Sequence, residues 1–187
     1  MKKQLIIPII SGTLILFLWN AISWMVLPFH ANSLRTLPDE ALATNLEIVM
    51  PGSGVYHYPG LPNEETSIEE ISKKLKDDPR ITLMVYQEGS FELFEPSSFL
   101  KSLFINLLTC SMLFIILGKL SLPSLAGVLQ WSFLLGLLVS FVSDVSIMNW
   151  FKFPLTYTMI NVSDHIISFL LVGTVYWLFI GKKQSHA

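Results

Sequence analysis

The chain has 187 residues, of which 52% are hydrophobic and 14% are charged, and its formal net charge is −2. The charge is uneven, because 12 of the 14 acidic residues lie between Pro28 and Ser98, where only five residues are basic. This acidic segment argues against a nucleic-acid partner, which requires a basic surface, and against docking of the segment on anionic lipid. The single cysteine, Cys110, excludes a disulfide within the chain.

Four stretches of the chain are apolar and long enough to cross a lipid bilayer. A spanning helix needs about 20 mainly apolar residues to cross about 30 Å of hydrocarbon. The four stretches cover approximately residues 5–27, 99–117, 123–143 and 160–180. The sequence therefore predicts an integral membrane protein whose main partner is the lipid bilayer.

The first stretch follows two lysines and resembles the start of a secretory signal. Its apolar run, residues 5–27, is longer than the about 7–15 apolar residues of a signal peptide. The nearest small-residue cleavage site would end at Ala31, but Phe29 occupies its −3 position. We therefore expect an uncleaved first membrane helix.

Basic residues near the ends of the spans predict the orientation, because Lys and Arg are enriched on the cytoplasmic side. Lys2 and Lys3 precede the first span, Lys119 lies between the second and third, and Lys182 and Lys183 follow the fourth. We expect a multi-pass protein of a bacterial inner (cytoplasmic) membrane, with both termini cytoplasmic. The very short link at Lys119 also predicts that the second and third spans form an antiparallel hairpin.

The predicted fold is an all-α transmembrane bundle of four helices with a small α+β extracytoplasmic insert between helices 1 and 2. Residues 1–27 form the first membrane helix, 28–98 the extracytoplasmic domain, and 99–187 the remaining three helices with a short cytoplasmic tail. A serine of Pro96-Ser97-Ser98 is expected to cap the second span. Ser121 or Leu122 is expected to cap the third span, with Pro123 in its first turn.

The insert contains signals for two helices and several strands. We expect a helix from Thr36 to Met50, a strand over 55–58 and a second helix that begins with the capping-box pattern Ser67–Glu70. Residues 81–87 and 90–94 should form a β-hairpin around Glu88-Gly89. Apolar spacing predicts that the second helix turns three side chains inward: Ile68, Ile71 and Leu75.

No standard catalytic motif is present, and the sequence predicts no particular cofactor. The candidate site residues are four ionisable groups in or beside the membrane spans: His30, Asp144, Asp164 and His165. Four further polar positions in the spans could bind a ligand or serve in packing: Asn20, Asn106, Asn161 and Ser168. An ionisable group within a membrane span is a functional hypothesis by default, because its burial is costly.

Three interpretations of these residues remain open. His30, Asp144, Asp164 and His165 could form one metal or acid–base site, since two imidazoles and two carboxylates suit zinc. They could instead be structural, with Asp164 capping a helix that starts near it, Asp144 in the headgroup region, His30 in a loop, and asparagines joining helices. The third interpretation is a pocket for a ligand or a lipid headgroup.

Small residues in the third span, Ser132, Gly136 and Ser140, recur every four positions and permit close helix approach. This stripe could face the bundle interior or a second copy of the chain. The leading functional hypothesis is a structural or partner-binding component of a membrane complex, contacting a membrane or extracytoplasmic protein. The alternatives are a membrane-embedded metal-binding protein or enzyme that uses the His and Asp residues, and an oligomeric transporter or channel subunit.

Overall fold

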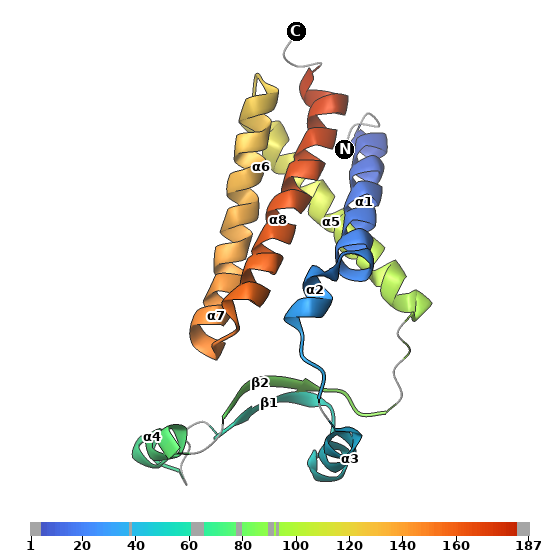
Figure 1. The fold of residues 1–187 in the computed structure, drawn as a ribbon. Coiled ribbons are helices and arrows are strands. Elements are labelled where there is room, and N and C mark those ends of the chain that lie inside the picture. The colour runs from blue at the N-terminus through green and yellow to red at the C-terminus, as the bar shows by residue number, and fades with distance from the viewer. Residues whose placement is uncertain are drawn as a thin grey trace. The chain divides into compact units, whose positions relative to one another are not determined.

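The computed structural model in Figure 1 describes residues 5–37, 39–60, 66–77, 80–89, 92 and 94–182. The chain divides into two compact units, which are described separately below. The membrane unit comprises Met1–Leu34 and Glu92–Ala187, and the insert comprises Arg35–Phe91. The short helix that carries His30 belongs to the membrane unit.

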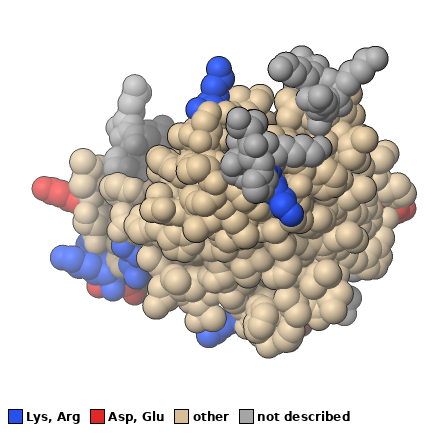
Figure 2. Space-filling view, turned by 90° about the horizontal axis from the view of Figure 1, so that it is seen from above, with Lys and Arg blue, Asp and Glu red and all other residues tan. Residues whose placement is uncertain are grey.

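The membrane unit contains four helices that are long and apolar enough to cross a membrane, as the sequence predicts. Their bounds are Ile6–Val26, Pro96–Leu120, Leu125–Phe151 and Leu155–Gly181. Many large apolar side chains of these helices are exposed, and most of the surface visible in Figure 2 belongs to uncharged residues. Such a surface suits a hydrocarbon environment.

Three of the four helices include a π-helical turn, in which the chain is wound with one extra residue per turn. The elements of the first and second spans are α1 (Ile6–Ala21), the π-helical turn Ile22–Val26, α2 (Pro28–Ser33) and α5 (Pro96–Leu120). Those of the third and fourth are α6 (Leu125–Ser140), the π-helical turn Phe141–Val145, α7 (Ser146–Phe151), α8 (Leu155–Tyr176) and the π-helical turn Trp177–Gly181.

The helix starts differ from two of the expected caps. Helix α5 begins at Pro96 with Glu95 as its N-cap residue, so the expected serine cap is wrong. Helix α6 is capped by Ser124, whose hydroxyl oxygen accepts a hydrogen bond from the Gly127 amide at 3.1 Å. Ser121 has a φ of 49° and lies in the preceding turn, so the expected cap at Ser121 or Leu122 is also wrong.

Helix α8 lies at the centre of the membrane unit and contacts α1, α5 and α6 (Figure 1). Helix α6 packs along α8, whereas α5 runs obliquely and makes few contacts with α6 beyond the turn that joins them. The short link predicted between the second and third spans is present, but the two helices that it joins do not pack along their length. A short link fixes where two helices meet, but side-chain packing decides which helices run together.

The small-residue stripe of α6 explains its close packing on α8. Ser132 and Ser140 are completely buried, and a Cβ atom on Gly136 would lie 3.1 Å from both the His165 carbonyl oxygen and Ile166 Cα. On α8, Gly173 faces Ser132, and its added Cβ would lie 3.0 Å from the serine Cβ. The stripe therefore faces the bundle interior, and the alternative of a face for a second copy is wrong.

The described residues of the insert form two helices and one antiparallel pair of strands. They are α3 (Glu40–Val49), β1 (Gly54–Tyr58), α4 (Ile68–Asp77) and β2 (Ile81–Tyr86). Strand β1 pairs with β2, with Val55 opposite Val85. The predicted capping box is confirmed, because the Ser67 amide donates to Glu70 Oε2 at 3.1 Å and the Glu70 amide to Ser67 Oγ at 3.2 Å.

Two expectations for the insert are wrong. Strand β2 pairs with the distant β1, and not with a strand after Glu88-Gly89. Of the expected second strand, positions 90, 91 and 93 lie outside the described residues, and Glu92 and Phe94 are not in a strand. In α4 only Ile71 is buried, whereas Ile68 is 71% exposed and Leu75 is 42% exposed.

Candidate functional site

The four ionisable candidates lie toward the end of the bundle where α2 and α7 are found (Figure 1). Asp164 and His165 are consecutive residues of α8, so their side chains point about 100° apart around the helix. Each faces a π-helical turn of a neighbouring span, Asp164 the turn Ile22–Val26 and His165 the turn Phe141–Val145. Helix α8 is thus joined to the first and third spans at nearly the same depth.

The first polar cluster consists of Ser23, His30 and Asp164. The Ser23 hydroxyl lies 2.8 and 2.7 Å from the two carboxylate oxygens of Asp164, and His30 Nε2 lies 2.7 Å from Oδ2. His30 is only 1% exposed, and its ring stacks on Trp24 with a centroid distance of 3.8 Å. His30 is therefore a buried residue of α2, so its interpretation as a loop residue is wrong.

Asp164 lies in the middle of α8, because that helix begins at Leu155. The interpretation of Asp164 as a helix cap is therefore wrong. With His30 Nε2 donating to the carboxylate, His30 Nδ1 remains buried and has no hydrogen-bond partner among the described residues. Ser23 donates to the carboxylate and not to the imidazole, which differs from the order in which a histidine activates a serine nucleophile.

The second polar pair joins His165 to Asp144. His165 Nε2 lies 3.1 Å from Asp144 Oδ2, which also accepts a hydrogen bond from the Ser143 hydroxyl at 2.9 Å. The side chain of His165 is 37% exposed and that of Asp144 is 18% exposed. This pair connects α8 to the π-helical turn that follows α6.

The four candidates therefore form two pairs and not one cluster of four. Across the described ranges of the chain, no group of three or more His, Cys, Asp or Glu side chains could hold a metal ion. Zinc sites in proteins use at least three protein ligands. What the pairs provide chemically is hydrogen bonding between helices, with Asp164 as the acceptor for Ser23 of the first span and for His30 of the following helix α2.

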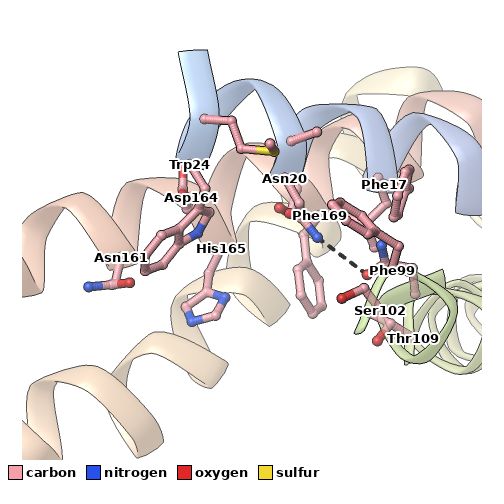
Figure 3. Close-up of a pocket in the computed structure, with 15 residues that line it drawn as sticks. Phe17, Asn20, Trp24, Phe99, Ser102, Thr109, Asn161, Asp164, His165 and Phe169 are labelled. Atoms are coloured by element: carbon pink, nitrogen blue, oxygen red, sulfur yellow. Dashed lines mark hydrogen bonds between the residues drawn. The ribbon is translucent and has the colours of Figure 1, made fainter. Parts of the chain in front are cut away.

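A cavity of about 510 Å³ lies between α1, α5 and α8, next to the first polar cluster (Figure 3). All four predicted polar positions line it, together with Asp164 and His165. The predicted hydrogen bonding between helices is confirmed for one pair, because Asn20 Nδ2 donates to Asn106 Oδ1 at 3.3 Å. The Asn161 amide donates to the Tyr157 carbonyl oxygen of its own helix.

The sequence interpretation missed most of the remaining cavity wall. The missed side chains are two hydroxyl residues and four aromatic ones: Ser102, Thr109, Phe17, Trp24, Phe99 and Phe169. Single aromatic or hydroxyl residues in a span carry no sequence signal that separates a cavity wall from ordinary packing or lipid contact. Comparison of the chain with protein-family models, curated proteins and solved structures finds no match.

Proposed function

We propose that this protein is an accessory component of a bacterial inner-membrane assembly that acts by binding a partner protein through its insert. The proposed orientation places both termini in the cytoplasm and the insert outside. It is supported by Lys119 and Lys182, which belong to the end of the bundle where α1 begins and α8 ends (Figure 1). Basic residues favour the cytoplasmic side of a membrane.

The observation that carries this proposal is the apolar surface of the insert. Val55 and Val85 lie directly opposite each other on the two strands and are 64% and 75% exposed. Ile48 of α3 and Ile68 of α4 are also largely exposed. A domain outside the bilayer gains free energy when such side chains are covered, and an exposed apolar pair such as Val55 and Val85 is a suitable contact for a partner protein.

The polar pairs support binding in preference to catalysis. The carboxylates of Asp164 and Asp144 are each bonded to a histidine and a serine, and all of these bonds except that of Ser143 to its neighbour Asp144 join separate helical segments. In neither pair does a serine hydroxyl among the described residues donate to a histidine ring, as a serine nucleophile would. The groups that the sequence offered for acid–base chemistry therefore have a structural explanation.

The test compares the double variant V55T/V85T with wild type after extraction from native membranes in a mild detergent. Threonine keeps the branched shape that strands favour and reduces the apolar surface. We expect the wild-type chain to migrate in a complex with another protein, and the double variant to lose it. The matched control is V142T, because Val142 is 73% exposed on the membrane unit, and it should keep the complex.

A photocross-linker at position 85 identifies the direct neighbour in the same membranes. We expect a cross-link to a different protein at position 85 and none to that protein at position 142. Migration of the wild type as a single chain, or cross-links only to copies of itself, would contradict the proposal. The conservative variants D144N and H165Q should leave the complex intact. If either variant failed to form the complex, the Asp144–His165 pair would have a role in binding the partner.

A further inference from the structure

The cavity between α1, α5 and α8 has the size of a small-molecule site. Ligand cavities in proteins commonly measure about 300–1,000 Å³, and this one measures about 510 Å³.

One wall of the cavity offers an unused hydrogen-bond donor. Asn106 is 5% exposed, and its side-chain oxygen accepts the hydrogen bond from Asn20. Its side-chain nitrogen is buried and has no partner among the described residues. Because a buried donor without an acceptor is costly, an oxygen atom of a bound molecule would stabilise this position once the Asn106 side chain turns its nitrogen toward the cavity.

The charges of the wall select the kind of molecule. Among the described residues neither Lys nor Arg lines the cavity, and the two ionisable residues that line it, Asp164 and His165, already pair with His30 and Asp144. A phosphate group would therefore enter a poorly solvated space without a counter-charge, which is strongly unfavourable. An uncharged head group avoids this cost.

The rest of the wall suits an apolar body. Phe17, Trp24, Phe99 and Phe169 lie among the polar residues in Figure 3. Trp24 and Phe99 are also exposed on the surface of the membrane unit, so the cavity opens toward the surroundings of the helices. A molecule dissolved in the bilayer can reach it from that side.

We infer that this cavity binds an uncharged amphiphile whose head carries a hydrogen-bond-accepting carbonyl or hydroxyl oxygen. The oxygen accepts a hydrogen bond from the Asn106 amide, and the apolar body lies among the aromatic side chains. Two classes of membrane molecule carry this chemistry, neutral glycerolipids and prenylated quinones. The inference is independent of the proposed protein partner, because it concerns the membrane unit alone.

The test measures protection of a cysteine placed in the cavity wall, with full-length protein in nanodiscs of phosphatidylcholine. Ser102 lines the cavity, and the natural Cys110 is completely buried, so S102C provides the reactive thiol and wild type the background. Diacylglycerol, a short-chain ubiquinone or phosphatidylglycerol is added, and the rate of maleimide labelling is followed. A ligand at about ten times its dissociation constant should slow labelling about tenfold.

We expect protection by diacylglycerol, by the quinone or by both, which identifies the source, and less than about twofold protection by phosphatidylglycerol. In the S102C background, N106L should remove the protection. S111A should keep it, because Ser111 lies on the same helix but not in the cavity wall, and its hydroxyl donates to the Leu107 carbonyl oxygen. A21F, which adds bulk to the cavity wall, should abolish protection without removing any hydrogen bond.

Circular dichroism and gel filtration identify any variant that does not fold. If either A21F or N106L fails to fold, the other variant still tests the loss of ligand binding. Equal protection by phosphatidylglycerol would overturn the choice of an uncharged head. Absence of protection by every amphiphile, or full protection in A21F, would overturn the site itself.

Discussion

Replacing Ser23 with alanine tests whether donors from the first span hold Asp164 in place. Ser23 is 2% exposed, and its hydroxyl lies 2.8 and 2.7 Å from the two Asp164 oxygens. Neutral hydrogen bonds between membrane helices contribute about 0.6 kcal/mol on average and about 1.7 kcal/mol at most. Hydrogen bonds to charged groups contribute about 1.5–3 kcal/mol. Because His30 still donates to the carboxylate, we expect S23A to lower the free energy of unfolding by about 1.5–2 kcal/mol.

The assay is reversible unfolding in mixed micelles, followed by circular dichroism. The matched control is S163A, because Ser163 adjoins Asp164, is exposed, and donates only to the Met159 carbonyl oxygen of its own helix at 2.8 Å. Its free energy of unfolding should stay within about 0.5 kcal/mol of wild type. If S23A and S163A were equally stable, the proposed link between the first span and Asp164 would be refuted.

Two further predictions concern other parts of the membrane unit. G136A should lower the free energy of unfolding by about 2 kcal/mol in the same assay, because the added methyl group meets the backbone of α8, which cannot move away. The control G118A should be neutral or stabilising, since its added Cβ lies no closer than 3.8 Å to Tyr176. Equal effects of the two substitutions would refute this explanation. The hydrogen bond from Ser97 lowers the pKa of Glu95 below its ordinary value of 4.5, so folding favours the ionised carboxylate. The resulting stabilisation is complete above the pKa of Glu95 in the unfolded chain and is lost as the pH falls through the lower pKa of the folded chain. The variant S97A should raise the Glu95 pKa in an NMR titration. An unchanged pKa would show that the Ser97 hydrogen bond is not the cause.

The membrane helices were predictable from the sequence because crossing hydrocarbon requires long apolar runs that any local scan detects. Asn20, Asn106 and Asn161 were also predictable as polar positions, since side-chain amides are uncommon within such runs. The π-helical turns that present Ser23 and Asp144 were not predictable, because one extra residue in a helix leaves no pattern in composition. The partners His30 and Asp164 are 134 residues apart, and only the packing of α2 near α8 brings them together.

The errors in the insert have the same origin. Glu88-Gly89 is a good local turn signal, but β2 found its partner in β1, where Val55 and Val85 are paired across a long stretch of chain. The local preference for a turn competes with pairing between strands that are far apart in the sequence. A short window of sequence reveals only the local preference. The capping box at Ser67 was predicted correctly because both of its hydrogen bonds are made within four residues.

The membrane unit is stabilised differently at its two ends, and this difference is the strongest reason to place a ligand site where we do. The buried apolar cluster includes Ile9 of α1, Leu117 of α5 and Tyr176 of α8, toward the end where α1 begins and α8 ends (Figure 1). Toward the other end, the cavity removes packing contacts between the same helices, which forfeits dispersion energy. Hydrogen bonds from Asn20 and Ser23 bridge the helices there instead. Because such bonds fix the spacing of the helices without filling the space between them, this end can remain open for a ligand while the apolar end maintains the fold.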